Sequence, residues 1–272
     1  MFLTTIGFAV PCKAMALQIQ PTQYKAALKS GERQRGFVDV GNPTSQTVTV
    51  NFSVQAFRQI DDKGSLQFYD DEQVRAGIQP DLSSVDLAPR EAVRLYFLAD
   101  GSKLPSGDVF AAIFATTQPP DGQAGVSPAV RVGALLSITN GTPGSRTAII
   151  DHVAAGFWQF DTTIRGSYDI RNTAKEGTAT GFYPNVTVSL TPLQTTQTTT
   201  GSLIMAGRTR QNNFRLITER FGLYRLTVRY GNNERSVWVF VVSGVWRWVL
   251  VALGAILTGL GVLGWRRWRQ RR

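Results

Sequence analysis

The sequence predicts an all-β protein of two β-sandwich domains in series, followed by one C-terminal transmembrane helix. Apolar residues alternate with a period of two along most of the chain, with almost no run at helical spacing, as is typical of half-buried strands. The alternation stops at NGTPGS (140–145), a stretch rich in Gly, Pro and Asn, and starts again beyond it, which indicates two domains. A long apolar stretch close to the C-terminus predicts the helix.

The first domain is expected over residues 17–140. Its clearest strands are rich in Val, Phe, Ile and Thr and are bounded by Gly, Pro, Asn or Asp. They are SQTVTVNFSVQAF (45–57), EAVRLYFLA (91–99), GDVFAAIFATT (107–117) and AVRVGALLSIT (129–139). Turn-forming stretches such as DDKG (61–64) separate them. Several short strands at this spacing predict a sandwich in which one face of each sheet is buried.

The second domain is expected over residues 146–243, where the same alternation returns. The predicted strands are AIIDHVAAGFWQF (148–160), TIRGSYDIRNT (163–173), TATGFYPNVTVSL (178–190), GLYRLTVRY (222–230) and RSVWVFVVS (235–243). The Thr and Gln-rich stretch TPLQTTQTTTG (191–201) is too polar to bury. It is therefore expected to be an exposed loop, with an edge strand as the alternative.

The predicted transmembrane helix covers residues 245–265. No charged side chain occurs between Val249 and Gly264, and flanking tryptophans bring the stretch to about 20 residues, which suffices to cross a bilayer. These tryptophans, Trp246, Trp248 and Trp265, fit the aromatic belts at the two membrane interfaces. The alternatives are a buried core helix or a basic amphipathic helix on the membrane surface. The span has no polar face to lie among headgroups, which favours crossing.

The basic tail, residues 266–272, gives the orientation. It contains arginines and no acid: Arg266, Arg267, Arg269, Arg271 and Arg272. By the positive-inside bias the tail is cytoplasmic, and everything N-terminal to the helix is extracytoplasmic. The localisation expected is thus a cell membrane, crossed once. Within the helix, Ala255 and Gly259 form a small-xxx-small pair that could pack a second helix closely, so self-association is a further expectation.

The first 16 residues are expected to be a signal peptide. They contain a short apolar stretch, and Ala14 and Ala16 match the small-x-small pattern that precedes signal-peptidase cleavage. No Lys or Arg precedes Lys13, so the charged segment at the start of such signals is missing. The alternative is a first strand. Cys12 does not fit a lipidation site, because Val10 and Pro11 stand where small residues are expected.

The composition argues against catalysis. Without Cys12, the chain has no cysteine for disulfides, thiolate-bound zinc or thiol chemistry. Its single histidine, His152, is not accompanied by a GxSxG or HExxH motif. The expectation is a protein that is not an enzyme, with no catalytic residues, no cofactor and no metal ion, in which His152 is structural or exposed.

The charge also bears on partners. The formal net charge is +10, and the five tail arginines account for half of it, which leaves roughly +5 on the remainder of the chain. Such a surface suits anionic envelope polymers or an acidic partner. The chain has no zinc-finger spacing, RNP-like motif or continuous basic helix, so nucleic acid is not an expected partner.

Two groups of residues are candidate sites. The acidic stretch FYDDEQ (68–73), with Asp61 and Asp62, could supply calcium ligands, but it lacks the D-x-D-x-D-G order and is expected to be a solvated loop. Five aromatic residues could form a sugar-binding platform, although such residues more often fill the core between sheets. They are Phe157, Trp158, Phe160, Tyr183 and Trp238.

The order of features resembles a known family. The N-terminal part has a short first strand, a Ser30-Gly31-Glu32 turn, a strand ending at Asn42 and a long paired strand. This layout resembles the immunoglobulin-like module of WxL-interacting surface proteins of Gram-positive bacteria and, more distantly, the first domain of periplasmic pilus chaperones. LPSGDVFAAIFATT (104–117) and FGLYRLTVRYGNNERSVWVFVVS (221–243) are similar to later parts of the former family. The resemblance implies two immunoglobulin-like domains and a wall-facing role.

The leading functional hypothesis is therefore a membrane-anchored, extracytoplasmic binding or scaffolding protein. Its partners would be the lipid bilayer and a cell-wall polymer or another surface protein, contacted through strand edges and loops. The alternative is a chaperone-like assembly factor for exported surface or pilus subunits. An envelope enzyme would need converging carboxylates, for instance from Asp61, Asp70 or Glu72, and no spacing predicts them.

Overall fold

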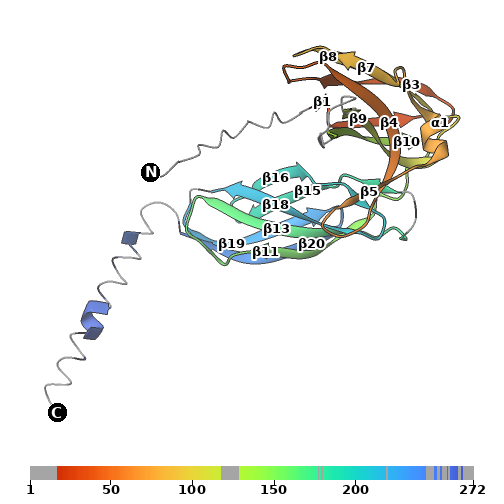
Figure 1. Ribbon diagram of the computed structural model, residues 1–272. Helices are drawn as coiled ribbons and strands as arrows, with labels where there is room; N and C mark the ends of the chain where they lie inside the picture. Colours follow the sequence, from red (N-terminus) through yellow and green to blue (C-terminus); the bar gives the residue numbers. More distant parts are fainter. Residues whose placement is uncertain are drawn as a thin grey trace, which may run out of the picture. The chain divides into compact units, whose positions relative to one another are not determined.

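The computed structural model describes residues 17–117 and 129–242, apart from 177, 179 and 219, together with scattered positions between 248 and 265 (Figure 1). Two compact units divide these residues. The first takes those up to Arg58 and Gln67–Gly144, and the second takes Gln59–Leu66 and those from Ser145 onward. Strands dominate both units, so the mostly β fold that the sequence predicts is confirmed.

The first unit is a sandwich of two sheets around one apolar core. One sheet has the order β1 (Gln18–Gln20), β3 (Arg33–Gly41), β8 (Ala92–Asp100), β6 (Ile78–Pro80). The other has the order β2 (Gln23–Leu28), β10 (Arg131–Asn140), β9 (Gly107–Thr117), β4 (Val48–Gln59), β5 (Leu66–Tyr69), with β7 (Ser84–Leu87) also on β4. Every second residue over much of the central strands is buried, because alternate side chains of a strand point to opposite faces of its sheet.

The first strand of this unit is divided between the two sheets. β1 pairs antiparallel with β3, whereas β2 pairs parallel with β10. The chain changes sheets at the cis peptide bond between Gln20 and Pro21. One consequence is that β2 reaches only part of β10, from Leu135 to Asn140.

The second unit repeats this plan. One sheet has the order β11 (Ala148–Ala155), β13 (Thr163–Asn172), β18 (Thr209–Ile217). The other has the order β12 (Trp158–Gln159), β20 (Asn233–Val241), β19 (Gly222–Tyr230), β15 (Asn185–Thr191), β16 (Thr195–Thr200), and β14 (Gly181–Phe182) pairs with β17 (Ile204–Met205). Here too the first strand is divided, because β11 lies antiparallel to β13 and β12 lies parallel to β20.

Both sandwiches share a glycine–phenylalanine pair across the sheet. Gly36 lies opposite Phe97, and Gly166 lies opposite Phe214. In each pair a Cβ on the glycine would come closer than 3.0 Å to the phenylalanine ring, so the ring occupies the space that the missing side chain leaves. Only glycine fits beneath a ring in this position.

A buried asparagine follows each of these glycines by six residues. Asn42 and Asn172 are both almost completely buried, and each uses its amide group to bond backbone atoms of neighbouring segments. In the second unit the hydroxyl of Tyr224 also donates to the carbonyl oxygen of Arg220 at 3.1 Å, the tyrosine corner found in immunoglobulin-like sandwiches. The pairing and these shared features identify both units as immunoglobulin-like.

Several boundaries differ from the prediction. The stretch 191–201 is not an exposed loop but contains β16, an edge strand along β15, because β-branched threonines favour extended backbone even where they are exposed. The predicted strand 148–160 is divided into β11 and β12 where the chain changes sheets. The predicted strand 178–190 is divided into β14 and β15, and Pro184, which cannot donate to a ladder, lies between them.

The acidic stretch 68–73 is also more ordered than expected. It leads into α1 (Glu72–Gly77), whose first turn is capped by Asp71: the carboxylate accepts a hydrogen bond from the backbone N–H of Val74 at 2.9 Å. A six-residue helix is too short to produce a helical apolar pattern, and for that reason the sequence shows almost no sign of it.

The segment Gln59–Leu66 belongs to the second unit and contains the predicted DDKG turn. The Gln59 side chain accepts a hydrogen bond from the N–H of Met205 at 3.2 Å, and the Asp62 carboxylate accepts one from the N–H of Thr209 at 2.9 Å. The Arg210 guanidinium donates to the carbonyl oxygen of Lys63 at 2.7 Å. The turn is therefore held by two backbone N–H groups and one side chain that lie about 150 residues away in the chain.

Tyr168 should make the second unit sensitive to alkali. Burial raises its pKa to about 12, and its hydroxyl has no hydrogen-bond partner among the described residues. Above pH 10 the unfolded chain releases this proton while the folded chain retains it, so stability is complete below pH 10 and is lost as pH rises towards 12. We expect the free energy of unfolding, measured with urea, to fall over this range. Tyr168→Phe should remove that part of the fall; an unchanged pH dependence in the variant would contradict this account.

Candidate functional site

The first candidate site is the open half of the β10 edge, Arg131–Ala134. On one side β10 pairs with β9 along its whole length. On the other side β2 begins opposite Leu135, and no described strand lies beside Arg131–Ala134. The sheet change between β1 and β2 thus leaves this half of β10 without a neighbouring strand among the described residues.

Backbone hydrogen-bonding groups of this half strand point away from β9. The backbone groups of Val130 face β9. Its C=O accepts a hydrogen bond from the N–H of Thr117, and its N–H donates one to the Thr117 hydroxyl, at 2.9 Å each. The N–H of Leu135 faces outward and donates to the carbonyl oxygen of Thr22 at 2.9 Å. Since the direction alternates along a strand, the N–H and C=O of Arg131 and Gly133 also point outward, towards the open edge.

The apolar row of β10 continues into this half. Ala134, Leu136 and Ile138 are fully buried, and Val132 packs against the same core. An added strand could pair with about four residues of β10, and every second side chain of that strand would point to the same side of the sheet as the core. The chemistry that fits is an extended polypeptide with alternating apolar residues.

The outer face of the open half carries one cation. The Arg131 guanidinium lies 3.5 Å from the centre of the Phe114 ring and donates to the Gln55 side chain at 2.6 Å. A Cβ on Gly133 would lie 2.8 Å from that same ring, so glycine is required beside it. The arginine is therefore held in place beside the open edge, which favours partners that are neutral or acidic on this face.

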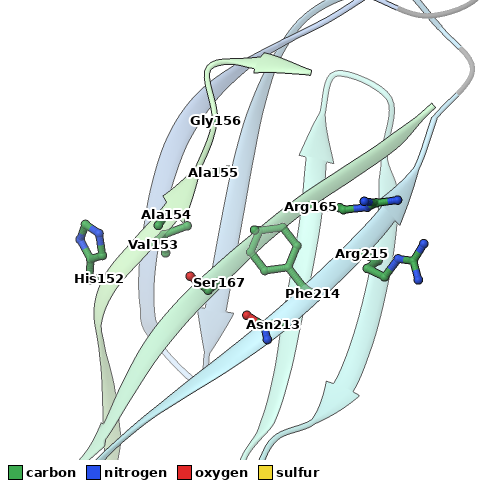
Figure 2. A pocket seen from close by; sticks show the side chains of 11 residues that line it. His152, Val153, Ala154, Ala155, Gly156, Arg165, Ser167, Asn213, Phe214 and Arg215 are labelled. Atoms are coloured by element: carbon green, nitrogen blue, oxygen red, sulfur yellow. The ribbon is translucent and has the colours of Figure 1, made fainter. Parts of the chain in front are cut away.

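The second candidate site is a trough of about 670 Å³ on the outer face of the β11–β13–β18 sheet (Figure 2). Its floor is made by the cross-strand row Ala154, Ser167 and Asn213, whose side chains are short. Figure 2 shows Arg165 and Arg215 together at one end and His152 at the other. The two arginines are directly paired across the strands and both are exposed, so that end of the trough suits anionic groups.

The third candidate site is a cluster of exposed aromatic side chains in the second unit. The expectation that the tryptophans and phenylalanines of this unit fill the core is wrong for four of the five residues named from the sequence. Phe157, Trp158, Phe160 and Trp238 are between 48% and 60% exposed. Tyr183 is half-buried and is not part of the cluster. The wrong expectation has a simple cause. Trp158 and Trp238 lie on the outer face of the sheet that contains β12 and β20, Phe157 and Phe160 flank β12, and alternation cannot distinguish a core face from a surface.

Most of the acidic residues named from the sequence accept hydrogen bonds from neighbouring segments. Asp61 accepts bonds from the N–H groups of Gly64 and Ser65, and these hydrogen bonds, above all those from Ser65, lower the pKa of its carboxyl group. Asp70 accepts a bond from Gln55 at 3.0 Å. Within the described residues no three His, Cys, Asp or Glu side chains come together in a way that could hold a metal ion. His152 is exposed.

The predicted membrane anchor lies largely outside the described residues. Trp248, Gly259 and Trp265 are described, in helical conformation and exposed. Trp246, Ala255 and the tail arginines Arg266, Arg267, Arg269, Arg271 and Arg272 lie outside the described residues. Among the residues that are described, none belongs to a helix long and apolar enough to cross a bilayer. The predicted signal residues Ala14 and Ala16 lie outside the described part as well.

Comparison with known proteins gives similar structures but no family. No family model matches the chain, so the resemblance to WxL-interacting surface proteins has no support from that comparison. No curated protein matches it either.

The similar solved structures are pilus chaperones and related domains. A chain of the CsuC–CsuE chaperone–tip adhesion subunit complex of Acinetobacter baumannii has 12% identity and a TM-score of 0.40, covering 83% of this chain and 99% of that one. The Escherichia coli chaperone DraB has 14% identity and a TM-score of 0.39, covering 82% and 98%. A PapD-like domain of human CEP192 has 11% identity and a TM-score of 0.36, covering 53% and 100%. Similarity of this extent does not decide a function.

The open β10 edge could not be found from the sequence. The stretch 129–139 reads as an ordinary strand, and nothing in it says that its partner stops halfway. The cue lies elsewhere, in Pro21, which interrupts the first strand and lies next to the change of sheet.

Proposed function

We propose that the chain is a chaperone-like binding protein that accepts an extended segment of an exported protein as an added strand on the open half of β10. The observation that carries the proposal is the edge Arg131–Ala134, where outward backbone groups and a core-facing apolar row meet without a neighbouring described strand. Strand addition uses this combination: main-chain hydrogen bonds supply affinity and alternating side chains supply specificity. No catalytic step is part of the proposal.

We further propose that the apolar segment 245–265 anchors the protein in a membrane, with the two sandwiches on the extracytoplasmic side. The support is the sequence: about 20 apolar residues followed by five arginines without an acid. This proposal retains the membrane anchor of the leading sequence-based hypothesis. It differs in the partner, which is an extended protein segment in place of a cell-wall polymer or an unspecified surface protein.

The test uses one pair of variants at a residue whose N–H points to the open edge. Arg131→Pro removes that N–H and places a ring in the way of an added strand, while the bonds to β9 stay intact. Arg131→Ala removes the side chain and its contacts with Phe114 and Gln55, but keeps the N–H. The probe is a synthetic peptide of alternating Val and Thr, added to the full chain in detergent.

We expect the peptide to slow amide hydrogen exchange at Arg131 and Gly133 several-fold. Its affinity should fall at least about tenfold in Arg131→Pro, the equivalent of one lost hydrogen bond, and stay close to the original value in Arg131→Ala. Equal binding by the original chain and Arg131→Pro would show that the peptide binds elsewhere and would remove the basis of the proposal.

A further inference from the structure

The exposed aromatic cluster of the second unit is continuous. Its rings contact one another: Phe157 and Trp158 at 5.3 Å between centroids, Trp158 and Phe160 at 6.2 Å, Trp158 and Phe240 at 5.1 Å, and Phe221 and Phe240 at 5.2 Å. We call these residues, together with the exposed side chains Ile217, Leu223 and Trp238, the terminal cluster. The five rings in contact form a contiguous apolar patch, and monomeric proteins seldom expose such a patch without a partner.

The terminal cluster lies at one end of the sandwich. The strand register brings together the end of β20 and the start of β19, with Phe240 opposite Leu223. It brings together the start of β13 and the end of β18 as well, with Thr163 opposite Ile217. The other end of β20 is the turn 231–234, which is polar (GNNE).

The chain leaves the second unit at this end. Val241 ends β20, Val242 follows, and the apolar segment 245–265 begins three residues later. With so short a connection, a membrane that holds this segment would lie next to the terminal cluster and far from the turn 231–234, since nine residues of strand span about 30 Å.

Four arginines lie towards this end of the sandwich, on both of its sheets. Arg165 and Arg215 face each other across the strands, Arg225 lies opposite Trp238, and Arg220 precedes Phe221. No described acidic side chain forms an ion pair with any of these four. Exposed like charges in direct opposition are unfavourable unless an anion lies between them, so this end of the sandwich is suited to anionic groups.

We propose that the terminal cluster docks the second unit onto the lipid bilayer surface. Tryptophan and phenylalanine side chains would enter the interfacial region, where amphipathic rings are favoured. The four arginines, including Arg165 and Arg215 at the end of the trough, would contact lipid phosphates. The inference rests on the proposed membrane anchor and is independent of strand binding at β10. Docking would hold the second unit upright on the membrane.

Cys12 is the only cysteine in the sequence, so a spin label can be attached at a single introduced cysteine once Cys12 is replaced. In full-length protein with Cys12→Ser, one spin label is placed either at Thr162, beside the terminal cluster, or at Asn232, in the turn at the opposite end. Both proteins are reconstituted in vesicles of phosphatidylcholine mixed with phosphatidylglycerol. The collision rate of each label with a water-soluble nickel chelate is then measured, and flotation of the vesicles tests the anchor separately.

We expect the chain to float with the vesicles and the label at Thr162 to collide with the chelate several-fold less often than the label at Asn232. The replacements Trp158→Ser, Phe160→Ser and Trp238→Ser together should bring the two rates close to each other while flotation persists. Arg165→Gln with Arg215→Gln should raise the Thr162 rate in mixed vesicles, whereas the control Arg229→Gln, near the far turn, should not.

The outcomes separate the two proposals. Flotation with equal collision rates at both positions overturns the docking and leaves the anchor standing. Failure to float overturns the anchor, and the docking with it. Reduced collision that survives the triple serine replacement would show that something other than the terminal cluster covers Thr162, and would also overturn the inference.

Discussion

Replacing Phe97 by alanine is expected to destabilise the first unit by about 3–5 kcal/mol, the usual cost of emptying a buried aromatic site. Phe97 is 1% exposed, its ring meets the Tyr24 ring edge-to-face at 5.1 Å, and it covers the backbone of Gly36. Because whole domains are stable by only about 5–15 kcal/mol, a loss of this size should be visible as a large fall in the urea midpoint of the full chain in detergent.

Phe37 supplies the control, since it neighbours Gly36 in the same strand but is 40% exposed. Phe37→Ala removes a contact with the Arg94 guanidinium and should cost about 1 kcal/mol or less. A double-mutant cycle then tests the pair itself. Gly36→Ala should be costly alone, because its Cβ meets the Phe97 ring, and close to neutral in Phe97→Ala, where the ring is gone. Additive effects would show that the ring and the glycine are not coupled.

Replacing Asn42 by alanine is the second change with a large expected effect, about 2–4 kcal/mol. Its amide nitrogen lies 2.7–3.1 Å from three carbonyl oxygens, those of Gln46, Leu87 and Ala88, which share its two hydrogens, and its amide oxygen accepts from the N–H of Thr44 at 3.0 Å. The residue is 1% exposed, so alanine would remove these buried and partly buried hydrogen bonds, at about 0.5–1.5 kcal/mol for each, and would take this donor from the buried carbonyl oxygen of Leu87.

Asn51 is the matched control for this change. It lies in β4 of the same unit and is exposed, so Asn51→Ala should alter the free energy of unfolding by no more than about 0.5 kcal/mol. If Asn42→Ala were equally mild, the buried carbonyl group of Leu87 would have to find another donor, and the hydrogen bonds of Asn42 would not be what holds these segments together.

The two units share a short sequence pattern that the alternation of apolar residues does not reveal. Residues 35–42 read RGFVDVGN and residues 165–172 read RGSYDIRN, so both follow the pattern R-G-x-x-D-x-x-N. In each unit the glycine of this pattern lies beneath a phenylalanine and the asparagine bonds neighbouring backbone. Comparing the chain with itself would have found this repeat, whereas alternation alone does not single out any position.

Most strands could be predicted because alternation is a local property. β9 and β19 have the predicted bounds, and β4, β8, β10, β13 and β20 differ from theirs by a few residues. β18 was missed, since TRQNNFRLI carries few apolar residues, and its buried side chains are supplied by Phe214 and Leu216 alone. α1 was missed because one turn and a half of helix produces no pattern.

By itself, then, the sequence determined that the chain is mostly β, that it divides into two β-rich halves, and that its C-terminal segment has the length and charge pattern of a membrane anchor. These properties depend on neighbours in the chain, so they can be read locally. Only the tertiary structure decided that β2 stops halfway along β10, and that Trp158, Phe160 and Trp238 gather on a surface instead of in a core. Both depend on which strands pair and which face of a sheet meets the other sheet. Pairing joins residues more than 100 positions apart, as for Leu135 and Gln23, and a period of two is the same on either face.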